Sequence, residues 1–192
     1  MSDAPRREQI LRAAEKLFAQ QGAARTTMAD LAREAGVAVG SVYLEFSSKD
    51  AIVQALSAAR HRQVIDAMRR AAGSEGSFAA RLKSIFDART SVLLRYAEEG
   101  THACELVHCV SAAVMAAQAR FLEEETELLA GLLRDGARAG KLVAPKPTAA
   151  ARTLVRAYAV FSPPQLFELP RDDVRDALRA MHELVLRGLL VR

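Results

Sequence analysis

The sequence has no long apolar run and almost no cysteine. No window reaches the roughly 18 to 20 uninterrupted apolar residues that a membrane-spanning helix needs. The opening residues, MSDAPRREQI, contain no apolar signal segment. Cys104 and Cys109 are the only cysteines, which argues against a disulfide framework and favours a reducing compartment. We therefore expect a cytoplasmic protein with no membrane partner.

Tryptophan is absent and aromatic residues make up only 5% of the chain. Hydrophobic residues nevertheless account for 51% and charged residues for 26%, which is the profile of a globular protein rather than a disordered or fibrous one. At 192 residues the chain is long enough for one or two domains with a sizeable core. The net charge of +4 permits a nucleic-acid partner without requiring one.

Apolar residues recur at helical spacing along most of the chain, and no pair of strands is indicated. From Ile10 to Phe18 the apolar positions are three or four residues apart, and Gly22 ends this first helix. Ser47 and Asp50 supply a start signal for a long helix. Later helices are expected at 49–72, 78–98, 102–113, 114–139, 147–161 and 171–190. The sequence predicts an all-α fold of about nine helices.

The second expected helix carries signals at both ends. Thr27 precedes the apolar run and Asp30 follows three residues later, which is typical of a capping box. Gly36 comes directly after the last helical residue, where the left-handed conformation is common. The sequence therefore predicts a short helix between Thr27 and Gly36.

The next stretch, VAVGSVYLEF, is rich in β-branched residues and could form a strand by propensity alone. Strict alternation would place Val39 and Val42 on opposite faces of a strand. Val39, Val42, Tyr43 and Phe46 instead fall at the spacing of one helical face. We expect a third short helix that packs this face inward.

Two short helices joined by a glycine turn form the layout of a helix-turn-helix DNA reader. Ala32 is small where the next helix crosses it, and Gly36 supplies a positive φ for the turn. Leu31, Val37 and Val42 would complete a miniature core.

Residues 6–56 resemble the DNA-binding domain of the TetR family of bacterial transcriptional regulators. The matching text is AAEKLFAQQGAARTTMADLAREAGVAVGSVYLEFSSKDAIVQAL. The resemblance implies an N-terminal three-helix DNA-binding domain at 1–50 and a larger helical effector-binding and dimerisation domain at 51–192. It further implies a homodimeric repressor, released from double-stranded operator DNA by a small-molecule effector, with no enzymatic activity and no cofactor.

Carried over from the family, the DNA-binding positions are Thr27, Ala38, Val39, Gly40, Ser41, Tyr43, Leu44 and Lys49. Hydroxyl and cationic groups at helix starts suit phosphate oxygens. Val39 and Leu44 could meet thymine methyl groups, and Ser41 could bond a base edge. Glu45 departs from the family, and its carboxylate would repel phosphate unless it turns to Arg25, Arg33 or Lys49.

Polar residues interrupt two apolar stripes in the second half of the chain. Arg89 lies in the stripe that runs from Leu82 to Tyr96, and Gln118 lies in the stripe from Val114 to Leu128. A buried polar group needs a partner, so these residues either face a ligand or pair internally. The ligand hypothesis places the following residues around one cavity: Arg89, Tyr96, Cys104, His108 and Gln118.

The segment HACELVHC contains His102, Cys104, His108 and Cys109. Thiolate and imidazole four residues apart could bind zinc or copper, but the groups divide over two helical faces and no second cluster exists. Pocket lining or core packing is preferred to a metal site, and no metal is assigned. A metal- or thiol-responsive regulator or a metalloprotein is one alternative function, and a helical interaction module without DNA binding is another.

The last two long helices carry much apolar surface bordered by arginines, which suits a symmetric four-helix contact between two copies of the chain. The residues expected at this dimer interface are Leu154, Tyr158, Phe161, Leu178, Met181 and Val185.

Overall fold

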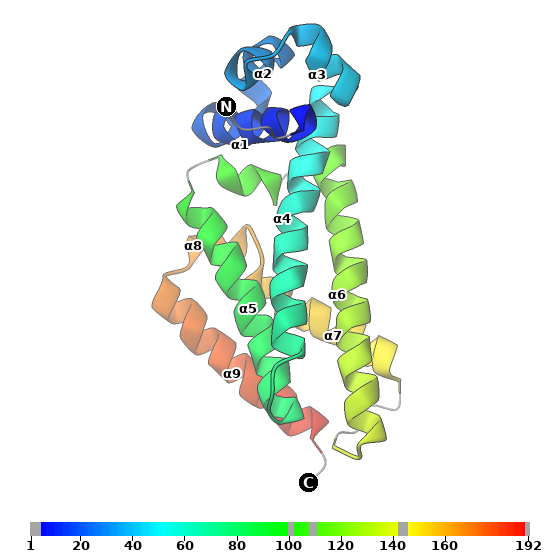
Figure 1. The fold of residues 1–192 in the computed structure, drawn as a ribbon. Helices are drawn as coiled ribbons and strands as arrows, with labels where there is room; N and C mark the ends of the chain where they lie inside the picture. The colour runs from blue at the N-terminus through cyan, green and yellow to red at the C-terminus, as the bar shows by residue number, and fades with distance from the viewer. Residues whose placement is uncertain (1–4, 100–101, 108–110, 142–145, 191–192) are drawn as a thin grey trace. The chain divides into compact units, whose positions relative to one another are not determined.

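The computed structural model describes residues 5–99, 102–107, 111–141 and 146–190, and within residues 103–104 it describes the backbone only. All regular structure in these ranges is helical (Figure 1), which confirms the predicted fold class. The α-helices are α1 (Arg6–Arg25), α2 (Met28–Ala35), α3 (Val39–Glu45), α4 (Lys49–Ala72), α5 (Phe78–Glu98), α6 (Ala112–Arg138), α7 (Pro147–Ala157), α8 (Gln165–Glu168) and α9 (Arg171–Leu189). Two 3₁₀ helices, η1 (Ala103–Leu106) and η2 (Tyr158–Phe161), complete the list.

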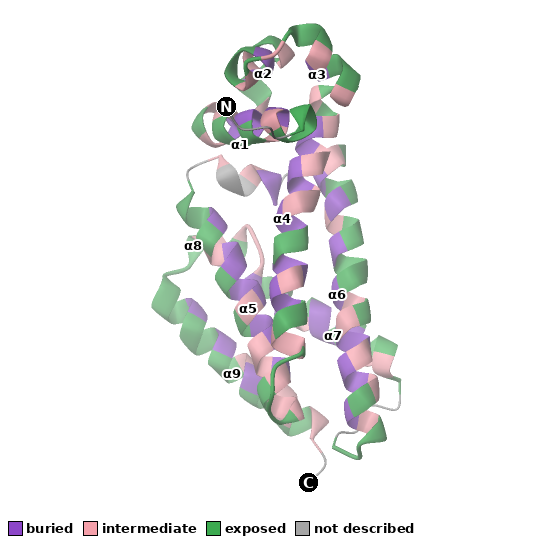
Figure 2. Cartoon of the chain, in the orientation of Figure 1, coloured by how far each residue is buried: buried purple, intermediate pink, exposed green. Residues whose placement is uncertain are grey.

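The chain divides into two compact units. The first comprises Met1–His61 and Tyr96–Ala119, and the second comprises Arg62–Arg95 and Arg120–Arg192. In both, buried positions recur along the helices at the spacing of an amphipathic face (Figure 2).

Several helix boundaries differ from the sequence prediction. The helix expected at 102–113 is wrong in its described part, where only the short η1 forms. The Ser111 hydroxyl accepts a hydrogen bond from the Val114 amide at 3.3 Å, so a new helix starts at this cap and α6 begins at Ala112. The start of α4 is capped by Ser48 rather than Ser47, because the Ala51 amide donates to the Ser48 hydroxyl at 3.2 Å.

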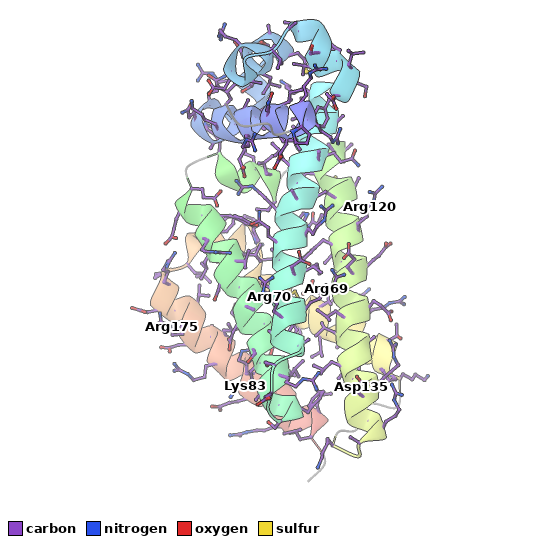
Figure 3. The ribbon with its side chains drawn as sticks, in the orientation of Figure 1. Arg69, Arg70, Lys83, Arg120, Asp135 and Arg175 are labelled. Atoms are coloured by element: carbon purple, nitrogen blue, oxygen red, sulfur yellow. The ribbon has the colours of Figure 1, made fainter. Side chains whose placement is uncertain are left out.

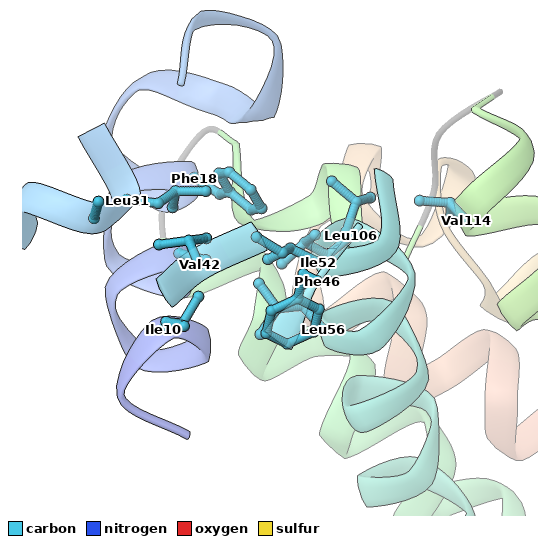
Figure 4. Close-up of a cluster of buried hydrophobic side chains, with 12 residues drawn as sticks. Ile10, Phe18, Leu31, Val42, Phe46, Ile52, Leu56, Leu106 and Val114 are labelled. Carbon is cyan, nitrogen blue, oxygen red and sulfur yellow. The ribbon is translucent and has the colours of Figure 1, made fainter. Parts of the chain in front are cut away.

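The first unit has one hydrophobic core, drawn in Figure 4. Side chains from α1, α2, α3, α4, η1 and α6 meet in it, and the labelled ones are Ile10, Phe18, Leu31, Val42, Phe46, Ile52, Leu56, Leu106 and Val114. Because α1, α2 and α3 each contribute, the orientation of the short α3 is set by packing and not by its own seven residues.

Gly22 is a break inside α1 at which the His102 side chain approaches closely. Its φ of 79° and ψ of 155° are not helical, and a Cβ there would lie 3.2 Å from the His102 Nδ1 atom. A side chain at this position would therefore be strained by its φ and would crowd the imidazole. The sequence prediction that the first helix ends here is partly right, since the chain kinks at Gly22 and then continues to Arg25.

The second unit contains a buried aromatic stack. The Phe86 ring on α5 and the Tyr158 ring in η2 are parallel, with centroids 3.5 Å apart. The Tyr158 hydroxyl lies 2.8 Å from the His182 Nδ1 atom, and His182 Nε2 lies 3.0 Å from Asp87 Oδ1. Burial, together with the Asp87 charge, raises the pKa of Tyr158. The tyrosine therefore stays neutral and joins α5, η2 and α9.

A buried ion pair lies in the same unit. Arg89 Nε on α5 is 2.8 Å from Glu125 Oε1 on α6, and their side chains are 3% and 0% exposed. The other Arg89 nitrogens donate to the Phe161 carbonyl at 2.9 Å and to the Ser162 hydroxyl at 2.7 Å. Burial raises the pKa of the Glu125 carboxyl, and Arg89 opposes that rise. The desolvation cost of the ionised Glu125 carboxylate is therefore larger than the stabilisation that it gains from Arg89.

We predict that Glu125→Gln gains stability relative to the wild type as the pH rises. The folded-state pKa of Glu125 lies above the unfolded value of about 4.3, so the wild type takes up a proton on folding between these two values. Its free energy of unfolding falls as the pH rises through that window, whereas glutamine does not titrate. Urea unfolding of both proteins from pH 4.5 to pH 8 measures the difference.

Glu127→Gln is the matched control, because this carboxylate is 72% exposed and pairs with Arg134 at the surface. It should show no comparable gain with pH. A wild type that gains stability over Glu125→Gln as the pH rises would show that the attraction of Arg89 outweighs the burial.

Candidate functional site

The turn between α2 and α3 follows from local chemistry. Gly36 ends α2 with φ 67° and ψ 32°, and a Cβ added there would meet nothing within 4 Å. Glycine is therefore favoured by the left-handed backbone and not by lack of space. The Val37 amide donates to the Ala32 carbonyl at 3.0 Å, which fixes the direction in which the chain enters α3.

The start of α2 is held by a complete capping box, as the sequence predicts. The Asp30 amide donates to the Thr27 hydroxyl oxygen at 3.1 Å, and the Thr27 amide donates to Asp30 Oδ2 at 3.0 Å. The hydroxyl and amide of Thr27, with Arg33 beside them, lower the pKa of Asp30. Thr27 itself is exposed, but its hydroxyl donates to Asp30 Oδ2 at 2.7 Å, so a phosphate contact by Thr27 stays a prediction.

The outer surface of α3 carries large apolar side chains. Leu44 is 82% exposed, Tyr43 is 53% exposed and Val39 is 41% exposed. The expected inward face of this helix is therefore only half right: Val42 and Phe46 are buried, but Val39 and Tyr43 are not. The seven-residue α3 is anchored in the core near its C-terminal end, through Val42 and the following Phe46. Its first turn projects outward, and Ala38 and Gly40 are also exposed.

Lys49 and Ser41 are the partly buried members of the predicted DNA-binding set. The Lys49 ammonium donates to the Thr26 carbonyl at 2.9 Å and to the Ala24 carbonyl at 3.3 Å. It therefore ties the start of α4 to the end of α1. A phosphate contact by Lys49 stays a prediction, and it would add to this structural role.

Glu45 has none of the three ion-pair partners proposed for it among the described residues. Arg33 pairs with Asp30 at 2.6 Å, and Lys49 bonds backbone carbonyls. Arg7 on α1 approaches instead, and its Nη1 donates to the Glu45 carbonyl at 3.0 Å while its guanidinium lies 4.1 Å from the Phe46 ring centroid. Sequence reasoning missed Arg7, because 38 residues separate it from its partner.

Sequence reasoning also missed Arg60, a buried cation in the first unit. Its side chain is 2% exposed, and Nη2 lies 2.6 Å from Glu99 Oε2 and 3.2 Å from Glu15 Oε1. The guanidinium lies 4.5 Å from the Tyr96 ring centroid, and the Tyr96 hydroxyl donates to the Arg60 carbonyl at 3.0 Å. The one sequence feature that could have indicated its burial is its position between the apolar residues Leu56 and Val64 of α4.

The residues predicted to contact a ligand fall in different parts of the chain. Arg89 belongs to the second unit, whereas Tyr96 and Gln118 belong to the first. The internal pairing that the sequence left open is present for Arg89 and for Tyr96, and Gln118 is partly buried. The Cys104 side chain and His108 lie outside the described residues, so a shared cavity stays a prediction.

The cysteine and histidine segment is described only in part, since Cys109 also lies outside the described residues. His102 is described, and its Nδ1 lies 2.6 Å from Glu105 Oε1. Within the described side chains, no three histidine, cysteine or acidic groups come together as a metal site.

Four of the residues expected at a dimer interface are buried within the protomer. They are Leu154, Tyr158, Phe161 and Leu178, each 6% exposed or less. Such side chains offer little area to a second chain, and the sequence pattern could not separate a core face from an outer face. Met181 and Val185 are partly buried, and Leu184 between them is 71% exposed.

No helix in the described parts of the chain is both long enough and apolar enough to cross a membrane.

The capped α2, the glycine turn and the projecting α3 define a helix-turn-helix protein with an added helical domain. Two family models match this chain: bacterial regulatory proteins of the tetR family over residues 10–56, and the tetracyclin repressor-like C-terminal domain over residues 79–182. The second alone covers more than half of the chain, and the chain belongs to the TetR family.

Known relatives agree with this assignment. The HTH-type transcriptional regulator TtgR of Pseudomonas putida is 46% identical over 69 residues, 36% of this chain and 32% of TtgR. The chain thus covers about a third of that relative. The HTH-type transcriptional repressor KstR2 of Mycobacterium tuberculosis is 31% identical over 123 residues, 60% of this chain and 56% of KstR2.

Solved structures show the same fold. The transcriptional regulator FadR from Bacillus subtilis, in complex with stearoyl-CoA, superposes with a TM-score of 0.71 at 21% identity. The superposition covers 94% of this chain and 98% of that one. At this identity the likeness establishes the fold alone.

We predict that Thr27→Ala lowers the free energy of unfolding by about 1 kcal/mol, the usual cost of losing an N-terminal cap. Urea unfolding at neutral pH measures the loss. Thr27→Ser keeps the hydroxyl and is the control, so it should stay close to the wild type. Equal stability of Thr27→Ala and Thr27→Ser would mean that the capping box does not stabilise α2.

Proposed function

We propose that this chain is a homodimeric, ligand-released repressor that binds operator DNA through α3. The observation that carries the proposal is the exposed outer surface of α3, presented by a helix-turn-helix whose inner side is packed in the core of the first unit. Family membership supports it, because the family consists of transcriptional regulators. Two copies would place their α3 helices in successive major grooves of a near-palindromic site.

The proposed division of labour assigns 1–50 to DNA binding and 51–192 to effector binding and dimerisation. The first compact unit extends beyond residue 50 because the start of α4, η1 and the start of α6 share its core. The contact set on DNA remains Thr27, Ala38, Val39, Gly40, Ser41, Tyr43, Leu44 and Lys49. The chain would act in the cytoplasm, as a binding protein and not as an enzyme.

The effector would be a small molecule bound by the helical domain. The FadR structure was solved in complex with stearoyl-CoA, so one protein of this fold is known with an organic ligand. In this chain the buried Glu125 is a group that a ligand could satisfy, because its Oε2 has no hydrogen-bond partner among the described residues. A ligand that donates to Glu125 would compete with the pairing of Arg89, which links α5 to η2.

The proposed dimer contact uses the outer side of α9. Ala177, Ala180, Leu184 and Gly188 are all exposed and recur at the spacing of one helical face. Small residues let two helices approach closely, and Leu184 would supply the central apolar contact. Met181 and Val185 would lie at the edge of this face.

The proposal is tested by gel shift with the intergenic DNA upstream of the chain's own gene, at low and moderate salt. We expect specific binding by the wild type and about a tenfold loss for Tyr43→Ala, since a hydrogen bond to a charged phosphate contributes about 1.5 to 3 kcal/mol. Tyr43 is half-exposed, so the variant should fold normally. Absence of specific binding without effector would overturn the proposal.

Glu45→Gln is the companion variant in the same experiment. Removing a negative charge beside the DNA should leave the affinity equal or make it tighter. A large loss would instead mean that the carboxylate accepts a hydrogen bond from a cytosine or orders α3.

We predict that Leu184→Glu dissociates the dimer, because two carboxylates would meet at the twofold axis. Sedimentation or light scattering at micromolar concentration measures the mass. Leu169→Glu is the matched control, since Leu169 is 42% exposed and lies outside α9. A dimer that persists in Leu184→Glu would place the contact elsewhere.

A further inference from the structure

A groove of about 760 Å³ runs between α5 and α9 in the second unit. Its walls carry Lys83, Asp87, Thr90, Ser91, Leu94 and Arg95 from α5, and Arg171, Val174, Arg175, Leu178, Arg179, His182 and Glu183 from α9. Lys83 and Arg175, which mark the two walls, are labelled in Figure 3. A volume of this size suits a small organic ligand.

The groove is strongly cationic. Five of its lining side chains are lysine or arginine and two, Asp87 and Glu183, are acidic. Asp87 is already engaged by His182 at 3.0 Å. The positive charges are therefore in excess over the carboxylates that could neutralise them within the groove.

Arg175 and Arg179 of α9 make weak ion pairs at the surface. Arg175 is 3.3 Å from Asp172, and Arg179 is 2.9 Å from Asp176, and all four side chains are at least 63% exposed. Exposed pairs of this kind contribute little to stability. The guanidinium groups can therefore exchange their partners for an anionic ligand.

Three of the arginines form a row along one side of α9. Arg171, Arg175 and Arg179 follow one another every four residues, which spaces them by about 6 Å along the helix axis. Such a row suits a ligand with several anionic groups better than one with a single charge. Arginine also matches the geometry of phosphate oxygens with two parallel hydrogen bonds.

Thr90 is an independent sign of a ligand at this wall. It is 3% exposed, it lines the groove, and its Oγ1 has no hydrogen-bond partner among the described residues. A buried hydroxyl left without a partner is costly. A phosphate oxygen in the groove would supply the missing acceptor.

The groove is compatible with the proposed dimer contact. At about 100° per residue, Leu184 lies on the opposite side of α9 from Arg175. Pairing of two chains through Leu184 would leave the arginine row open. The hydrogen bonds that join His182 to the Asp87 carboxylate and to the Tyr158 hydroxyl fix this side of α9 against the core.

We propose that the groove between α5 and α9 is a binding site for a small organic polyphosphate. Lys83, Arg95 and the arginine row of α9 hold its phosphate groups, and Thr90 donates a hydrogen bond to one of them. The site is separate from the buried Arg89 and Glu125 pair, and it acts whether or not the chain binds DNA.

The test is calorimetric titration of the full-length protein with sodium tripolyphosphate at low salt. We expect saturable binding with one site per chain. Arg95→Gln combined with Arg175→Gln should weaken it at least tenfold, since both side chains are exposed and their loss should not disturb the fold. Thr90→Val, which keeps the volume and removes the hydroxyl, should weaken it several-fold.

The matched control is Arg152→Gln combined with Arg156→Gln, which removes the same charge from exposed positions of α7 outside the groove. It should bind tripolyphosphate as the wild type does. An equal loss of affinity in the control would show that binding depends only on net charge, and would overturn the site. Wild-type affinity in the Arg95 and Arg175 variant would also overturn it. Citrate at the same concentration should bind more weakly, and equal affinity would overturn the assignment to phosphate. Because the titration contains no DNA, its result is independent of the gel shift.

Discussion

The buried guanidinium of Arg60 is the interaction on which the first unit depends. Arg60 lies within α4, and its guanidinium contacts Glu15 on α1 and Glu99 just beyond the end of α5. The Tyr96 ring packs over the guanidinium. A charge taken out of water costs several kcal/mol unless it is paired. The side chains of Glu15 and Glu99 are 50% and 44% exposed, so the geometry holds only while all three segments keep their places. The α1 helix that presents the helix-turn-helix is thus tied by one side chain to the end of α5.

This arrangement gives the proposed release mechanism a physical route. A shift of α5 at Glu99 either breaks the 2.6 Å contact to Arg60 or carries Arg60 with it. Either change would alter the contact between Arg60 and Glu15 on α1, because Glu15 and Glu99 bind the same nitrogen of Arg60. Under that proposal, the core that α1 forms with α2 and α3 would move as a rigid body, since packed interiors do not deform continuously.

The sequence predicts the helix-turn-helix well because its signals are local. Thr27, Asp30 and Gly36 lie within ten residues of one another. The side chains of Thr27 and Asp30 cap each other's backbone amides, and Gly36 acts through its own backbone conformation. The sequence cannot decide between alternatives where distant contacts determine the outcome. The partner of Arg89 is 36 residues away on α6, and a helical stripe cannot reveal whether an arginine faces a ligand or a glutamate. The same limit applies to Tyr158, which belongs to an apolar stripe in either case and is placed in the core only by Phe86 and His182.

The composition of α3 constrains how this chain can read DNA. Base edges are usually read by side chains with hydrogen-bond donors or acceptors, yet the projecting part of α3 offers Val39, Gly40 and Leu44 with only Ser41 and Tyr43 as polar groups. The exposed Leu44 and Val39 suit thymine methyl groups, and Gly40 lets the backbone come close to the groove. Specificity would then rest on shape and apolar contact more than on bidentate hydrogen bonds. Glu45, which has no ion-pair partner among the described residues, is the one charged side chain of α3. In the proposed complex its carboxylate would disfavour a phosphate close to the end of this helix.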